Sequence, residues 1–179
     1  NTGLFNDGDS LMKLGMFYAK SIEASKIPFD MLYGPAYKGI PLVTSIVIAF
    51  ASIGRNIPFA FNRKEKKDHG EGGVIIGTPL KGKVLIVDDV ISAGTSVNES
   101  VNLILKEGAQ PSGIAISIDR EEKGSGVLSA VEEIKATHHL PICHLTSLKE
   151  IMRYIESNTT YASYIDAMRD YQKEYGIKT

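Results

Sequence analysis

The pattern of apolar positions divides the chain into alternating helices and strands. Between residues 11 and 22 apolar side chains recur at helical spacing, which predicts an amphipathic helix that begins after Ser10. A second apolar run, residues 41–53, starts with a proline and is followed by Gly54, as expected of a helix with a defined start and end. Helical spacing predicts further helices over residues 95–108, 127–136, 148–155 and 161–175.

Short apolar runs between these helices predict strands. The run KVLIVD, residues 83–88, is continuous and β-branched, which is typical of a parallel strand covered on both faces. Other runs predict strands over residues 29–33, 59–61, 74–76, 113–118 and 142–145. A strongly charged stretch, residues 63–73, separates two of them and predicts a long hairpin. Strands that alternate with helices predict an α/β domain with a largely parallel sheet.

Length and composition indicate one soluble globular domain over residues 1–179. The chain is 43% hydrophobic and 23% charged, close to the averages for globular proteins. Its 20 basic and 21 acidic residues give a net charge of −1, without the basic bias of a nucleic-acid binder. The longest apolar stretch is too short to cross a bilayer, so we expect no membrane partner and a cytoplasmic location. The single cysteine, Cys143, is expected to be a buried structural thiol.

The strongest chemical signal is the run VLIVDDVISAGTS, residues 84–96. It places two acids at the end of a buried strand, followed by a turn of small residues into a helix. Backbone N–H groups of residues 91–96 would converge at the helix N-terminus, where Gly94 permits close approach and three hydroxyls add donors. This arrangement predicts a phosphate cradle. A helix cap or an acidic pocket is the alternative, and the turn with its hydroxyl groups disfavours it.

The two acids are expected to have different roles. Neighbouring residues of an extended strand point to opposite faces, so both can share a target only where the chain starts to turn. We expect Asp89 to accept hydrogen bonds from ligand hydroxyls, and Asp88 to orient the backbone or a metal-bound water.

Residues 84–96 resemble the motif that binds phosphoribosyl pyrophosphate (PRPP) in type I phosphoribosyltransferases. Residues 63–73, RKEKKDHGEGG, resemble the catalytic loop of those family members that accept orotate; GPAYKGIP and IDRE extend the likeness over most of the chain. A merely solvated charged loop is the alternative for residues 63–73, but the glycines favour a mobile lid. The resemblance implies a mainly parallel twisted sheet flanked by helices, a long β-hairpin catalytic loop and an N-terminal hood.

The resemblance also implies a role for each matched residue. It assigns PRPP binding to Tyr37, Lys38, Arg63, Lys64, Lys67, His69, Asp88, Asp89, Val90, Ile91, Ser92, Ala93, Gly94, Thr95 and Ser96. Catalytic roles go to Lys67, His69 and Asp89, and orotate binding goes to Ser92 and Arg120. A non-proline cis peptide or backbone strain is expected at Ala36–Tyr37.

The activity implied by the resemblance is transfer of ribose 5-phosphate from PRPP to orotate, which forms orotidine 5′-monophosphate and pyrophosphate. Mg²⁺ would be held through the substrate, with water linking it to Asp88 or Asp89, and would have no direct protein ligand. A homodimer with shared active sites is expected, in which the loop of one subunit acts on the other. A purine phosphoribosyltransferase and a PRPP-sensing regulator that binds nucleic acid are the alternatives. Arg120 and the charged loop oppose the first, and the net charge opposes the second.

The first residues, NTGLFNDG, have the composition of a turn that follows an earlier segment. We therefore expect a segment before Asn1. The resemblance implies that two phenylalanines and a lysine of the orotate pocket belong to it, which would leave the hood incomplete in this sequence.

Overall fold

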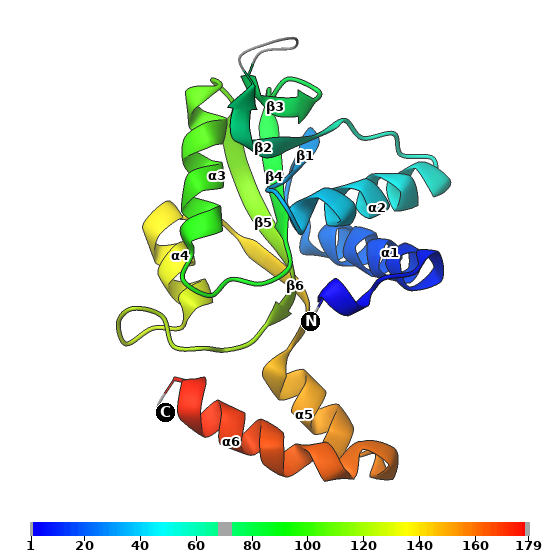
Figure 1. Ribbon diagram of the computed structural model, residues 1–179, viewed down its shortest axis with the longest axis vertical. Coiled ribbons are helices and arrows are strands. Elements are labelled where there is room, and N and C mark those ends of the chain that lie inside the picture. Colours follow the sequence, from blue (N-terminus) through cyan, green and yellow to red (C-terminus); the bar gives the residue numbers. More distant parts are fainter. Residues whose placement is uncertain (1, 68–72, 178–179) are drawn as a thin grey trace.

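A computed structural model describes residues 2–67 and 73–177, in which one sheet forms the centre of an α/β fold (Figure 1). The sheet has the order β3-β2-β1-β4-β5-β6, and only the pairing of β2 with β3 is antiparallel. The prediction of a largely parallel sheet is confirmed. The strands are β1 (Met31–Gly34), β2 (Phe59–Lys67), β3 (Gly73–Gly77), β4 (Lys83–Asp88), β5 (Gln110–Asp119) and β6 (Ile142–Ser147).

Helices cover both faces of the sheet. Helices α1 (Gly8–Ser25) and α2 (Gly39–Ser52) lie on one face, and α3 (Thr95–Lys106) and α4 (Ala130–His138) lie on the other (Figure 1). The side chains of β4 alternate between two cores: Val84 and Ile86 pack on the α3 side, whereas Leu85 and Val87 pack on the α1 side. All four are fully buried, as the continuous apolar run predicts.

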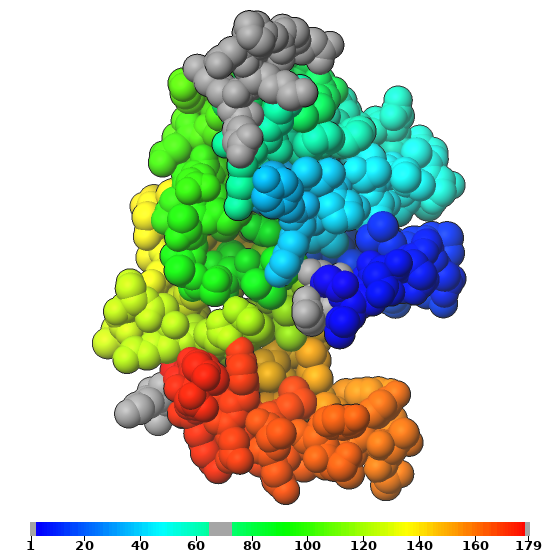
Figure 2. Space-filling model, in the orientation of Figure 1, coloured from blue at the N-terminus to red at the C-terminus, as the bar shows by residue number. Residues whose placement is uncertain are grey.

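The chain ends in a helical hairpin beyond β6. It consists of α5 (Leu148–Glu156), a 3₁₀ segment η2 (Thr159–Tyr164) and α6 (Ile165–Tyr175), and it forms the lower lobe of the molecule in Figure 2. A short 3₁₀ turn, η1 (Thr2–Leu4), precedes α1. In the part of the chain that the structure describes, no helix is long and apolar enough to cross a membrane.

Helix starts differ from the predictions because the capping residues were misplaced. Helix α1 begins at Gly8, since the Asp7 carboxylate accepts the backbone N–H of Ser10 at 2.8 Å. Helix α4 begins at Ala130 instead of Val127, because Ser129 and Glu132 form a reciprocal capping box. The helix predicted over residues 161–175 is divided, with α6 preceded by η2.

The hairpin differs from its prediction in the length of one arm. Strand β2 continues from Phe59 to Lys67, so the charged residues 63–67 are strand and not loop. Residues 68–72 lie outside the described residues. The charged arm pairs with β3, with Asn62 opposite Ile75 and Lys67 opposite Gly73. Cys143 is half-buried beside the α1 and α2 core, and burial raises the pKa of its thiol.

Candidate functional site

The candidate site lies where β1, β4 and β5 end, because neighbouring parallel strands bring their C-terminal loops to one edge of the sheet. Lys38 follows β1 and Asp89 follows β4. The Lys38 Nζ atom donates to Asp89 Oδ2 at 2.8 Å. The lysine side chain is 59% exposed and the aspartate side chain 9%. This ion pair joins the two loops that the sequence predicts to bind PRPP.

Asp88 shapes the loop after β4. Its Oδ1 atom accepts the backbone N–H of Asp89 at 2.8 Å, and its Oδ2 atom accepts the hydroxyl of Ser96 at 2.8 Å. Burial raises the pKa of the Asp88 carboxyl, opposed by these hydrogen bonds. Both oxygens therefore hold parts of its own loop, the backbone of Asp89 and the side chain of Ser96.

Two buried hydroxyls, which the sequence analysis missed, fix the backbone of the acidic pair. The Tyr18 hydroxyl donates to the Asp88 carbonyl at 2.8 Å, and the Ser117 hydroxyl donates to the Asp89 carbonyl at 2.6 Å. Tyr18 is fully buried, and this burial raises the pKa of its phenol above the usual range. The apolar pattern places Tyr18 in the core, but no local signal identifies its partner on a distant strand.

The turn between β4 and α3 has the form of an anion cradle. Gly94 has a φ of 71°, in the left-handed region that favours glycine, and a Cβ atom there would lie 2.6 Å from the end of the Ile134 side chain. The first helical bond runs from the Asn98 N–H to the Gly94 carbonyl at 2.9 Å, which leaves earlier N–H groups available at the helix start. Ser92, Ala93 and Thr95 are exposed beside them.

Not every residue assigned to the cradle can present its side chain. The side chain of Ile91 is only 4% exposed and packs in the core with Val97, so only its backbone can meet a ligand. Val90 is half-buried, and its N–H donates to Asp89 Oδ1 at 3.0 Å.

The loop after β1 carries the other predicted residues. The Ala36–Tyr37 peptide bond is cis, which confirms that prediction. The Tyr37 side chain is 66% exposed, and Lys64 Nζ lies 5.0 Å from the centre of its ring. Asn62, missed by the sequence analysis, holds this loop against β2 because its Oδ1 atom accepts the Ala36 N–H at 2.7 Å.

The structure therefore brings part of the predicted set together. Tyr37 and Lys64 are in contact, as are Lys38 and Asp89. Arg63 is half-buried on β2 near this edge, and Lys67 ends β2 farther along. His69 lies outside the described residues.

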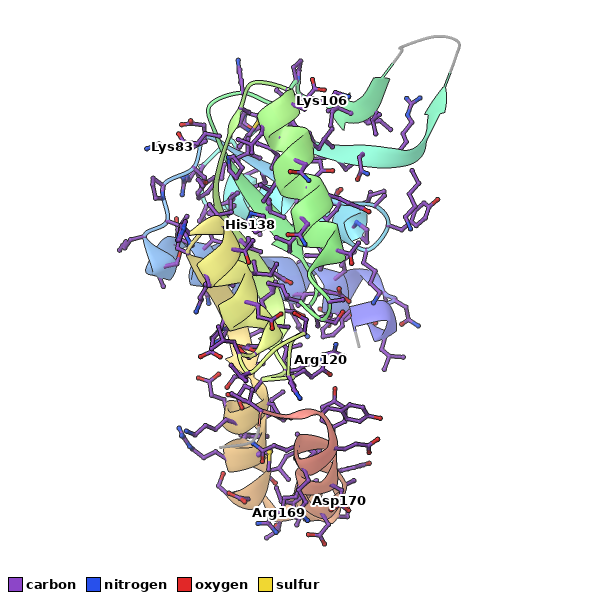
Figure 3. The ribbon with its side chains drawn as sticks, turned by 90° about the vertical axis from the view of Figure 1, so that its left-hand side faces the viewer. Lys83, Lys106, Arg120, His138, Arg169 and Asp170 are labelled. Carbon is purple, nitrogen blue, oxygen red and sulfur yellow. The ribbon has the colours of Figure 1, made fainter. Side chains whose placement is uncertain are left out.

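Arg120 immediately follows β5, the neighbour of β4. Its side chain is 33% exposed, and its Nη2 atom lies 2.8 Å from Oε2 of Glu122. Figure 3 shows Arg120 between the sheet and the helical hairpin formed by α5 and α6.

The donor set fits a cation that is held mainly by a ligand. Among residues 2–67 and 73–177, no three His, Cys, Asp or Glu side chains are grouped as they would be around a metal. Both oxygens of Asp88 and both oxygens of Asp89 already accept protein donors. Because Mg²⁺ typically keeps several waters and binds substrate phosphates, these carboxylates suit contact through water.

Comparison with known proteins assigns this fold and site to a class. The chain matches the family described as phosphoribosyl transferase domain over residues 4–136, and it is a phosphoribosyltransferase-fold protein. It is 57% identical to the orotate phosphoribosyltransferase of Chromobacterium violaceum, over 99% of this chain and 83% of that protein. The corresponding protein of Nitrosospira multiformis is also 57% identical, over 99% of this chain and 78% of that protein. The chain belongs to the orotate phosphoribosyltransferase family.

A solved structure supports the same assignment. The orotate phosphoribosyltransferase of Francisella tularensis superposes with a TM-score of 0.84 at 38% identity, covering 98% of this chain and 85% of that one. The UMP synthase of Leishmania donovani, at 18% identity and a TM-score of 0.71, shares the fold over 93% of this chain and 33% of its own.

Proposed function

We propose that this protein transfers ribose 5-phosphate from PRPP to N1 of orotate and releases pyrophosphate, a step in pyrimidine nucleotide synthesis. The observation that carries the proposal is the Lys38–Asp89 ion pair, because it joins the loop after β1 to the anion cradle after β4. The identity of 57% to orotate phosphoribosyltransferases over nearly the whole chain supports the choice of acceptor.

Each part of the site has a distinct task in this reaction. The backbone N–H groups and hydroxyls of residues 91–96 bind the 5-phosphate, and Asp89 accepts hydrogen bonds from the ribose hydroxyls. The bond from C1 to pyrophosphate breaks as the bond from C1 to N1 forms, with inversion at C1, and the proton on N1 is released to the departing pyrophosphate or to water. Positive charge develops on the sugar and negative charge on the pyrophosphate. Lys38, Lys67 and His69 stabilise the departing anion.

A Mg²⁺ ion bound through PRPP would supply further positive charge to the departing pyrophosphate. Asp88 and Asp89 would hold it through water, since their oxygens are engaged as described above. We also propose a cytoplasmic location and a homodimer with shared active sites. Closure of the charged hairpin at residues 63–73 over the site would exclude water from the reacting sugar.

Asp89→Asn is expected to lower kcat/KM for PRPP by about 10²-fold. Two charge-assisted hydrogen bonds to ribose hydroxyls, at roughly 1.5 kcal/mol each, account for a loss of that size. Steady-state kinetics with varied PRPP measure it. Asp30→Asn is the matched control, because the Asp30 carboxylate also accepts a backbone N–H, that of Lys83 at 2.7 Å, but lies at the opposite edge of the sheet. Equal decreases in kcat/KM for PRPP in Asp89→Asn and Asp30→Asn would contradict the role of Asp89.

Arg120→Lys is expected to raise the KM for orotate at least about 10-fold and to leave the KM for PRPP within about 2-fold. A guanidinium grips a carboxylate through two parallel hydrogen bonds, a geometry that lysine cannot reproduce. Arg169→Lys is the control, since Arg169 is a half-exposed arginine paired with Glu156 on the helical hairpin. If Arg120→Lys raised the KM values for orotate and PRPP equally, Arg120 would have no specific role in recognising the acceptor.

The function is tested by offering orotate, uracil and adenine separately with PRPP and Mg²⁺, and measuring nucleotide formation. We expect product with orotate, little with uracil, which lacks the carboxylate, and none with adenine. Product with adenine would support the purine alternative. PRPP binding without transfer to any base would support the alternative of a PRPP-sensing regulator that binds nucleic acid.

A further inference from the structure

Three contacting side chains, those of Arg120, Glu122 and Tyr171, join the end of β5 to α6. The Glu122 carboxylate divides its oxygens between two partners: Oε2 faces Nη2 of Arg120 at 2.8 Å, and Oε1 accepts the hydroxyl of Tyr171. The Glu122 side chain is 15% exposed, so both contacts are largely shielded from water. A carboxylate held at both oxygens cannot rotate freely, and it therefore offers Arg120 one fixed position.

The backbone around Glu122 is fixed as well. Its carbonyl accepts the N–H of Ala130 at 3.0 Å, and it forms an antiparallel bridge with Gly176. The next residue, Lys123, donates its N–H to the Tyr175 carbonyl at 2.8 Å. The C-terminal end of α6 is thus attached directly to the loop that carries Arg120, and Figure 3 shows this junction below the sheet.

Glu122 does not use the whole guanidinium. Its carboxylate pairs with Nη2, and the buried Nε atom of Arg120 has no hydrogen-bond partner among the described residues. A buried donor without an acceptor is costly, whereas arginine can serve a second carboxylate with its remaining donors. Glu122 therefore supports the Arg120 guanidinium from one side and leaves other N–H donors of the guanidinium for a ligand.

We propose that Glu122 and Tyr171 are positioning residues that hold the Arg120 guanidinium for the carboxylate of the acceptor base. The inference rests on the proposed function and extends it to the C-terminal helix. A free arginine side chain has many rotamers, and binding a ligand in one geometry requires that this freedom be lost. Glu122 removes much of it before orotate arrives, and Tyr171 keeps Glu122 in place.

A purely structural ion pair is the alternative, and kinetics separate the two. Tyr171→Phe removes one hydroxyl, and we expect the KM for orotate to rise about 3–10-fold, the loss of one modest hydrogen bond. The KM for PRPP should stay within about 2-fold. Tyr175→Phe is the matched control, because its ring lies on the same helix with its centre 4.9 Å from that of Tyr171. The proposal would be overturned if Tyr175→Phe raised the KM for orotate as much as Tyr171→Phe does. It would also be overturned if Tyr171→Phe raised the KM values for orotate and PRPP equally.

Glu122→Gln provides the second variant, with Glu121→Gln as its neighbouring control. We expect a larger rise in the KM for orotate than for Tyr171→Phe, about 10–30-fold, because the charged partner of Arg120 is lost. Adding Tyr171→Phe to Glu122→Gln, or to Arg120→Lys, should then change the KM for orotate little, since the hydroxyl acts only through those groups. If the effects of the two substitutions on the KM for orotate were additive, Tyr171 would not act through Glu122 and Arg120, and the proposal would be contradicted. If Glu122→Gln fails to fold, the Tyr171→Phe comparison decides alone.

The wild-type reaction distinguishes this inference from the proposed function. A wild-type protein that does not use orotate overturns both. A wild-type protein that uses orotate, with a Tyr171→Phe variant of unchanged KM, overturns only the positioning role.

Discussion

Lys67→Ala is expected to lower kcat by about 10²–10³-fold, the usual cost of removing one preorganised group that stabilises charge in a transition state. The family resemblance places Lys67 near the departing pyrophosphate, and the structure places it at the end of β2, the charged arm of the hairpin. Because the charge develops during the reaction, the loss should appear mainly in kcat, with a smaller change in the KM for PRPP.

Kinetics of Lys67→Ala with both substrates saturating measure this loss. Lys106→Ala serves as the control, since Lys106 is an exposed lysine at the end of α3 farthest from the anion cradle. An unchanged kcat with a raised KM for PRPP would mean that Lys67 contributes only to ground-state binding.

Mixing Lys67→Ala with Asp89→Asn is expected to restore activity. Asn62 contacts the loop after β1, and Lys67 lies five residues farther along the strand. At ~3.4 Å per residue an extended arm can carry Lys67 up to roughly 17 Å from that contact, a reach that favours a site in a second subunit. The proposed site in a second subunit would account for the length of this arm.

The expected recovery follows from random exchange of subunits. Half of the dimers become mixed, and each has one site that combines an intact Asp89 with an intact Lys67 from the other chain. Activity should therefore reach about one quarter of the wild-type value. Exchange is verified by tagging one variant and isolating mixed dimers. Mixed dimers without activity would show that the loop serves its own subunit.

The sequence predicts best those elements whose signal is local. The run KVLIVD gives β4 its bounds, because a continuous β-branched segment has few alternatives. Strand β2 was predicted too short, since residues 63–67 are charged and only their pairing with β3 makes them strand. The start of α1 was displaced because Ser10 and Asp7 are both good capping residues, and only the hydrogen bond to Asp7 distinguishes them.

The candidate site shows the same difference between features with a local sequence signal and features fixed by contacts distant in sequence. The acidic pair and the small-residue turn are contiguous, so their motif is visible in the sequence. The groups that hold them are not: Tyr18 contacts Asp88 from α1, and Asn62 contacts Ala36 from β2. Tyr171 reaches Glu122 from the last helix. Such partners are distant in sequence and belong to residue types common in any fold, so only the packing of the elements identifies them.

Following the ribose carbon itself tests the central claim most directly. Wild-type protein is incubated with Mg²⁺, orotate and PRPP that carries carbon-13 at C1 of the ribose, and the reaction is observed by NMR. The account predicts that the labelled carbon becomes bonded to N1 of orotidine 5′-monophosphate in the inverted, β configuration, with one pyrophosphate released per nucleotide. Labelled carbon found in free ribose 5-phosphate while orotate remains unchanged, or a product with retained configuration, would contradict it.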